Sequence, residues 1–367
     1  MAPSTQEGVQ SAGRAVIALL GVCLALCASA CGGSSGSPDS SAYRAVGEPC
    51  NSSRLFAPDS VWNACFPTDA PIDSGSREMV EGLVHEVNQE TSAGTGPYIQ
   101  TNSYSTPLYV VHAHQKVVRV SLDDPHASWR RGLQRAFRKV PIPKHARPAA
   151  GSDAHMTVWQ PSRDRLWEFW QARKEHGRWH ASWGGAIKHV SSSPGYFDAR
   201  SWPGLSRSNW GATATSLPVI AGTMLVSELR AGEIKHALAL ALPAPRAESF
   251  AWPAQRTDGT GPPDAIPEGA RLRLDPDLDL DSLGLPRITL IMARAAQRYG
   301  MIVRDQTHAA IGFYAQDPVH AKKKGPYSGP NGLFGGQSPT QFLAEFPWDK
   351  LEVARMRLCS SGPCSER

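Results

Sequence analysis

The stretch GSDAHMTVWQPSRDRLWEFWQARKEHGRWHASW (residues 151–183) decides the fold of this chain. It predicts three consecutive β-strands, at residues 155–160, 165–172 and 178–183, because each segment is short, rich in aromatic residues and bounded by turn formers. We therefore expect a three-stranded meander at the centre of a mainly β protein.

Side chains alternate between the two faces of a strand, so each predicted strand has an apolar and a polar side. We expect the apolar side to be core, and it carries Met156, Val158, Trp167, Phe169, Trp179, Ala181 and Trp183. The polar side carries His155, Thr157, Trp159, Glu168, Trp170, His180 and Ser182. Indoles, imidazoles and a carboxylate on one sheet surface are typical of a binding cleft.

The composition is that of a folded chain rich in turns. Among 367 residues there are 33 Gly, 30 Pro and 11 Trp, and no long polar tract follows residue 42. The length allows one large domain or two smaller ones. We predict a single mainly β domain at residues 46–367. The formal charge of +5 is mild and does not indicate nucleic acid, and we expect no such partner.

The first thirty residues have the features of an export signal. Arg14 precedes an apolar run at residues 15–27, which is too short to span a bilayer, and small residues lead from the run to Cys31. We predict a signal peptide at residues 1–30 and lipidation of Cys31, as in palmitate-bearing bacterial lipoproteins, although Ala28 stands where that pattern prefers Leu. Residues 31–45 are rich in Gly and Ser and would form a spacer between a membrane anchor and the domain. Cleavage after Ala30 without lipidation is the alternative.

Cysteine usage agrees with export to the cell envelope. Cys50, Cys65, Cys359 and Cys364 remain after the signal and Cys31 are set aside, and an even number in an oxidising compartment indicates disulfides. Sequence proximity favours Cys50 with Cys65 and Cys359 with Cys364, while a tie between the two chain ends is the alternative. No spacing among the four is that of a zinc-ligand pair.

Further elements follow from periodicity and turn signals. Apolar residues at helical spacing predict helices at residues 76–87, 129–137 and 286–299, the first capped by Ser76. Alternating residues predict strands at 107–112 and 116–122, paired with each other, and at 270–274, 301–305 and 309–315. Residues 233–242 read as a strand in their first half, although their Ala and Leu content also suits a helix.

The titratable residues of a catalytic cleft would supply its acid and base. Hydrolysis of a glycosidic bond usually takes two carboxylates, and Glu168 is the first candidate. The candidates for the second are Glu228, Asp258 and Asp305. A lyase instead needs a base beside a uronate carboxylate and a donor that stabilises the developing charge. The candidates for those roles are His155, His180, His236, Lys235, Arg256 and Tyr299.

Sugar binding would use the aromatic residues of the same face. The apolar faces of sugar rings stack on indoles, for which Trp159 and Trp170 are the candidates, while hydroxyl groups bond to polar side chains. For this second role the sequence offers Arg256, Asp258 and Tyr299. The alternative is that both indoles pack beneath a loop and that the carboxylates are helix caps or surface groups.

Three other patterns point to different ligands. Residues 125–152 contain seven Lys or Arg and no acidic residue, which fits a solvated helix face near an anionic membrane or a platform for an acidic polysaccharide. His112 and His114 share a strand face, but no third metal ligand is evident. Residues 275–281 resemble the start of a calcium loop, yet Leu280 stands where its turn needs Gly. We therefore expect no metal and no cofactor.

Four segments carry a resemblance: GSDAHMTVWQPSRDRLWEFWQA, ELRAGEIKHALALAL, RTDG (residues 256–259) and AQRYGMIVRD (residues 296–305). With them the chain resembles, over roughly residues 50–320, a group of exported bacterial proteins that has no settled activity. A more distant likeness to β-jelly-roll, concanavalin-like glycan-active proteins is one of fold and composition, which does not fix function. The resemblance implies export and assigns no catalytic residue.

Taken together, these patterns predict a mainly β fold, a jelly-roll or β-sandwich with a few packed helices. The expected function is action on polysaccharide, as a glycoside hydrolase or a polysaccharide lyase, by an exported and lipid-anchored protein. The alternative is a non-catalytic glycan-binding or cell-envelope adhesion lipoprotein. An enzyme requires at least two titratable groups facing each other across the cleft, and a lectin does not.

Overall fold

The computed structural model describes residues 55–124, 130–197, 210–319 and 325–365. All of these residues belong to one compact unit, at residues 41–367. The predicted signal peptide, the spacer, Cys31 and Cys50 lie outside the described residues.

The described chain is mostly strand, with five α-helices. The helices are α1 (Ser76–Ala93), α2 (Arg131–Ala136), α3 (Val226–Ala231), α4 (Arg287–Arg298) and α5 (Pro339–Leu343). The strands are β1 (Tyr98–Gln100), β2 (Thr106–Val110), β3 (Val120–Leu122), β4 (Met156–Gln160), β5 (Arg165–Trp170), β6 (Arg173–Glu175), β7 (Arg178–Ala181), β8 (Trp183–Lys188), β9 (Leu238–Leu242), β10 (Phe250–Ala251), β11 (Arg271–Leu274), β12 (Met301–Gln306), β13 (Gly312–Tyr314), β14 (Gln316–Asp317), β15 (Leu351–Val353) and β16 (Leu358–Cys359).

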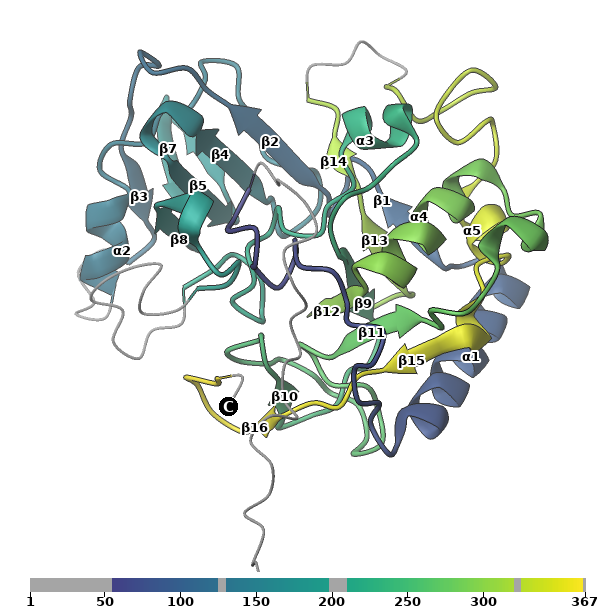
Figure 1. Ribbon diagram of the computed structural model, residues 1–367. Coiled ribbons are helices and arrows are strands. Elements are labelled where there is room, and N and C mark those ends of the chain that lie inside the picture. The colour runs from purple at the N-terminus through teal and green to yellow at the C-terminus, as the bar shows by residue number, and fades with distance from the viewer. Residues whose placement is uncertain (1–54, 125–129, 198–209, 320–324, 366–367) are drawn as a thin grey trace, which may run out of the picture. The chain divides into compact units, whose positions relative to one another are not determined.

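Three mixed sheets and one antiparallel pair organise the described strands (Figure 1). The six-stranded sheet has the order β1-β13-β9-β12-β11-β15, and the five-stranded sheet has the order β14-β2-β4-β5-β8. A three-stranded sheet, β3-β7-β6, and the pair β10-β16 complete the set. Parallel pairs such as β9 with β12 and β2 with β4 occur beside antiparallel ones such as β4 with β5. The prediction of a mainly β protein with a few helices is confirmed.

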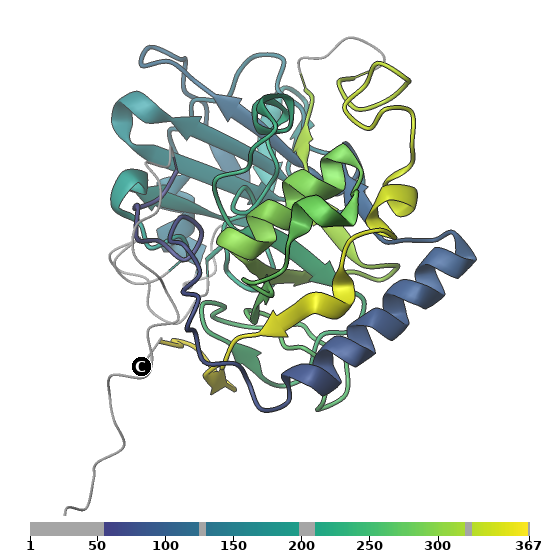
Figure 2. The same ribbon diagram turned by 45° about the vertical axis from the view of Figure 1, so that its right-hand side comes forward.

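The helices α1, α4 and α5 cover one face of the six-stranded sheet, and Figure 2 shows α4 lying across it. The side chains of β9 alternate between the two layers on either side of the sheet. Leu238, Leu240 and Leu242 pack in the cluster that contains the helices. Ala239 and Ala241 belong instead to a cluster that includes the core of the five-stranded sheet. Small side chains on this second face let the covering chain approach closely.

The predicted core face of the five-stranded sheet is confirmed. β4 and β5 pair antiparallel, with Val158 opposite Trp167, and both side chains are buried. The indole Nε1 of Trp167 donates to the Ala136 carbonyl at 3.2 Å. The ring of Phe169 lies 4.7 Å from that of Phe137, centroid to centroid. These contacts place α2 and the chain that follows it over this face.

The predicted three-stranded meander is wrong in its third strand. The neighbour of β5 is β8, with Trp170 opposite Trp183, whereas β7 pairs with β3 and β6 in the separate three-stranded sheet. The predicted segment at residues 178–183 therefore spans two strands, because the chain leaves one sheet after Ala181 and enters the other at Trp183. Because the two strands belong to different sheets, the alternation of side chains along β7 does not continue into β8, and Trp183 does not share the face of Trp179.

Other local predictions have mixed outcomes. The helix predicted at residues 286–299 is α4, and the disulfide between Cys359 and Cys364 is present. Cys65 is also disulfide-bonded. The strands predicted at 107–112 and 116–122 are not partners, since β2 pairs with β4 and β14 while β3 pairs with β7. Ser76 is not the cap of α1, because its hydroxyl oxygen accepts the Val353 N–H at 2.8 Å.

Candidate functional site

Residues 210–223 cover the predicted polar face of the five-stranded sheet at Glu168. Its side chain is 0% exposed. Its Oε1 accepts the Ala212 N–H at 2.6 Å and its Oε2 accepts the Val219 N–H at 2.8 Å. Burial raises the pKa of Glu168 to about 7, against the opposite effect of the two N–H donors. The placement of Glu168 in an open cleft is therefore wrong, because residues 210–223 lie over it.

The structure separates His180 and His236 from His155. His180 lies on β7, in the three-stranded sheet. The His236 Nε2 lies 3.2 Å from the Glu228 Oε2, and its Nδ1 donates to the Ala237 carbonyl at 2.8 Å. Burial alone would lower the pKa of His236, but the Glu228 carboxylate more than offsets this and the pKa is raised. The predicted placement of His155, Glu168 and His180 on one sheet face is therefore wrong, because His180 belongs to another sheet.

Two of the predicted sugar-binding residues also lie elsewhere. Trp159 is partly buried on β4 and packs against the core. Tyr299 follows α4 and is 2% exposed. Their burial agrees with the alternative of aromatic side chains packed within the protein.

A pocket of about 1060 Å³ brings five of the predicted residues together: His155, Trp170, Arg256, Asp258 and Asp305 all line it. It lies where the loop at residues 211–214 meets the ends of several strands from both larger sheets. The other lining residues are Tyr98, Tyr104, Arg130, Ser152, Asp153, Ser182, Trp183, Gly211, Ala212, Thr213, Ala214, Thr257, Gln306, Thr307, His308, Ala309 and Tyr314. Its size and its mixture of aromatic and polar groups are those of a ligand site.

One wall of the pocket is aromatic. Trp170 ends β5 and Trp183 begins β8, and the two are register partners. The Trp170 Nε1 donates to the Asp153 Oδ1 at 3.1 Å, which fixes the indole at the pocket edge. Arg130 lies over the Trp183 ring, 5.8 Å from its centroid. Trp183 was predicted to be core; it is half-buried and lines the pocket because of the change of sheet described above.

His155 lines the pocket from the segment before β4. Its Nε2 lies 3.1 Å from the Ala212 carbonyl, which only accepts, so Nε2 carries the proton of this bond. Burial lowers the pKa of His155, which favours the neutral ring. The buried Nδ1 is then an acceptor, and no partner for it occurs in the described part of the chain. The ring therefore has a lone pair available for a proton.

A β-bulge places Asp305 at the pocket. Along β12, Val303 pairs with Leu240 and Asp305 with Ala241, so Arg304 is the extra residue in the ladder. The fully buried Arg304 donates to the Val219 and Ala221 carbonyls and lies over the Tyr314 ring, 3.7 Å from its centroid. Arg304 at the bulge thus holds residues 210–223 over the five-stranded sheet, and the next residue, Asp305, lines the pocket.

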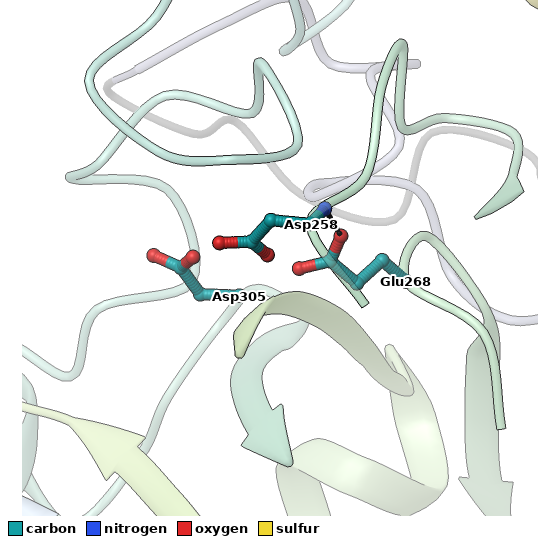
Figure 3. A group of neighbouring side chains, drawn as sticks. All are labelled: Asp258, Glu268 and Asp305. Atoms are coloured by element: carbon teal, nitrogen blue, oxygen red, sulfur yellow. Dashed lines mark hydrogen bonds between the residues drawn. The ribbon is translucent and has the colours of Figure 1, made fainter. Parts of the chain in front are cut away.

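Asp305 is one of three clustered carboxylates, with Asp258 and Glu268 (Figure 3). One oxygen from each lies within 4.8 Å of the others. Asp258 is exposed and Asp305 is partly buried, while Glu268 is 0% exposed. The Glu268 Oε2 accepts the Asp258 N–H at 3.2 Å, and the buried Oε1 has no partner in the described chain. We call these three residues the acidic trio.

The environment of the trio disfavours three separate negative charges. Burial raises the pKa of Asp305 to about 7, Arg304 opposes this effect and Asp258 adds to it. Burial, together with the charges of Asp305 and Asp258, raises the pKa of Glu268 well above its ordinary value. Arg256 donates to the Gly211 and Thr213 carbonyls, at 3.3 and 2.6 Å.

The sequence identifies part of this site. Asp258 and Asp305 are among the predicted carboxylates, but Glu268 is not, and the segment Pro-Glu-Gly around it carries no motif that identifies it. His112 and His114 are exposed, and among the described residues no group of three potential metal ligands includes them. In residues 275–281, Asp275 and Asp279 accept backbone N–H groups within their own loop. Among the described residues, the acidic trio is the one group of three potential metal ligands.

Comparisons with protein-family models, with curated proteins and with solved structures found no match to this chain. A search of the described helices for membrane spans found none with the required length and apolar character.

Proposed function

We propose that the protein binds a polysaccharide in the pocket and cleaves it, as a glycoside hydrolase or a polysaccharide lyase. The observation that carries this proposal is the composition of the pocket: Trp170 and Trp183 on one wall, with His155, Asp258 and Asp305 around the same space. Sugars offer apolar ring faces to indoles and hydroxyl groups to carboxylates. Several titratable groups facing one space are what distinguishes an enzyme from a lectin.

His155 supports the catalytic part of the proposal. His155 lines the pocket, and its buried Nδ1 has no hydrogen-bond partner in the described chain, so this nitrogen is the candidate acceptor for a proton of a bound substrate. The alternative function is binding without cleavage, as a glycan-binding or cell-envelope adhesion lipoprotein. It is favoured by the deep burial of His155, which is 4% exposed.

The finer fold assignment is part of the same proposal. Residues of the six-stranded and five-stranded sheets share one hydrophobic cluster, which supports a description as a β-sandwich. Of the two predicted architectures we keep the sandwich, since a jelly-roll is built from antiparallel strands and this chain has parallel pairs in both larger sheets.

The glycan proposal predicts a specific loss of function in Trp170→Ala. The full-length protein, purified in mild detergent, would be incubated with a panel of neutral and acidic polysaccharides. Binding, reducing ends and the absorbance of unsaturated uronates would be measured. Loss of the indole wall should weaken binding at least about tenfold, equivalent to about 1.4 kcal/mol.

Trp159→Ala is the matched control, because Trp159 is a partly buried tryptophan on the neighbouring strand and does not line the pocket. It should retain binding per mole of folded protein. Absence of binding to every polysaccharide by the wild-type protein would contradict the proposal, and binding without product would select the adhesion alternative.

We also propose that the protein is exported and anchored by lipid at Cys31. Support comes from the sequence at residues 1–45 and from the disulfide-bonded cysteines at 65, 359 and 364, which fit an oxidising compartment. Cys31→Ser should move the protein from the membrane fraction to the soluble fraction. Unchanged partitioning of the Cys31→Ser variant would show that the anchor lies elsewhere.

A further inference from the structure

We propose that Asp258, Glu268 and Asp305 form a calcium site, and that the bound ion holds the carboxylate of a uronate-containing polysaccharide in the pocket. The cation site stands on the geometry of the trio alone. The role assigned to the ion rests on the proposed function, because it concerns the ligand of the same pocket.

The spacing of the trio fits a single ion. Calcium binds oxygen ligands at about 2.3–2.6 Å, so two oxygens on one ion lie no more than about 5 Å apart. The three carboxylates satisfy this limit, with one oxygen of each within 4.8 Å of the others. They reach this arrangement from three separate segments, as Figure 3 shows.

The unpartnered oxygen of Glu268 points to a ligand independently of the clustering. Glu268 is 0% exposed, its Oε1 has no hydrogen-bond partner in the described chain, and its carboxylate faces the other two (Figure 3). A buried carboxylate either takes up a proton or is paired with a cation or a metal ion. No Lys or Arg among the described residues forms an ion pair with any member of the trio. Arg256 interacts electrostatically with all three carboxylates, but it forms no ion pair with them and its hydrogen bonds go to the Gly211 and Thr213 carbonyls. A cation at the trio would supply a direct partner.

The kind of ion follows from the ligand atoms. The trio offers carboxylate oxygens and no imidazole or thiolate, which selects a hard cation over zinc or copper. Calcium tolerates irregular geometry and accepts six to eight oxygens, whereas magnesium requires a near-ideal octahedron. Three residues leave several positions for water or a ligand.

The open positions face the pocket, since Asp258 and Asp305 line it and Asp258 is exposed. Together with Asp153, these carboxylates would repel an acidic sugar polymer. A divalent ion reverses this effect locally and gives a sugar carboxylate a ligand position. In a lyase the same ion would stabilise the charge that develops beside the carboxylate when a base removes the neighbouring proton.

The test is calorimetric titration of calcium chloride into the chelator-treated full-length protein. The wild type should bind one equivalent of calcium, more tightly than magnesium. Asp258→Asn, Glu268→Gln and Asp305→Asn should each weaken binding at least tenfold. The control Asp69→Asn removes the same charge from an exposed site outside both the trio and residues 275–281, and it should leave binding unchanged.

Substrate dependence is read separately, by measuring binding of polygalacturonate and alginate with calcium and with excess chelator. Binding of these polymers that is lost with the chelator supports the full proposal. Extracellular calcium modules have dissociation constants of about 0.1–1 mM. Absence of calcium binding by the wild type up to about 10 mM, which exceeds that range, would therefore overturn the cation site and leave the trio as a protonated cluster. If calcium binds but glycan binding does not change with the chelator, only the role of the ion is overturned. If no glycan binds at all, the proposed function is contradicted, while the calcium titration still decides whether the cation site exists.

Discussion

Replacing Glu168 with leucine should lower the free energy of unfolding by about 2–6 kcal/mol, because two buried backbone N–H groups would lose their acceptor at about 1–3 kcal/mol each. Those groups belong to Ala212 and Val219, in the segment that covers the five-stranded sheet and forms part of the pocket wall. Glu168→Gln keeps one acceptor oxygen and should have a smaller effect, about 1–3 kcal/mol. Urea denaturation measures both.

The same residue should make stability depend on pH. The pKa of Glu168 is raised from 4.5 to about 7 by burial, so the folded protein holds this proton more tightly than the unfolded chain. The resulting stabilisation is complete below about pH 4.5 and is lost as the pH rises through about 7, a total of about 3 kcal/mol. Glu168→Gln should lack this part of the pH dependence between pH 5 and pH 8.

Glu345→Gln is the matched control, since Glu345 is exposed. It should change the free energy of unfolding by less than about 0.5 kcal/mol. A Glu168→Leu protein as stable as this control would show that the carboxylate does not hold the covering segment.

Trp167→Ala should destabilise the protein by about 3–5 kcal/mol, as deletion of a buried aromatic side chain does. The Trp167 side chain is 2% exposed and packs in the core beneath α2, where its Nε1 donates to the Ala136 carbonyl at 3.2 Å. The Arg165 guanidinium lies over its ring, 4.8 Å from the centroid. The substitution removes the packing, leaves that carbonyl without its donor and opens a cavity that the rigid sheet cannot close.

Trp170→Ala provides the comparison within the same strand. Trp170 is half-buried at the pocket, so its loss should cost clearly less stability than that of Trp167, while under the proposed function it should weaken glycan binding. Thermal and urea unfolding of both variants would decide the point. Equal destabilisation by the two substitutions would contradict the assignment of one side chain to the core and the other to the pocket wall.

The sequence by itself determined the local features of this protein. Alternation in residues 155–170 identified β4, β5 and their core face, with Met156, Val158, Trp167 and Phe169 buried. Helical spacing and a following glycine identified α4, and proximity identified the pairing of Cys359 with Cys364. Each of these features depends on residues that are close in the chain, where backbone periodicity and loop length govern the outcome.

Only the tertiary structure decided what the polar side of those strands does. Strand alternation gives two faces but does not say whether distant chain covers one of them, and here residues 210–223 cover Glu168. The candidate site depends on still more distant contacts: Asp258, Glu268 and Asp305 come together through loops and a bulge in β12. Asp258 and Asp305 were recognisable as candidates, but Glu268 was not, because its burial beside them arises from packing between segments that have no local periodicity in common.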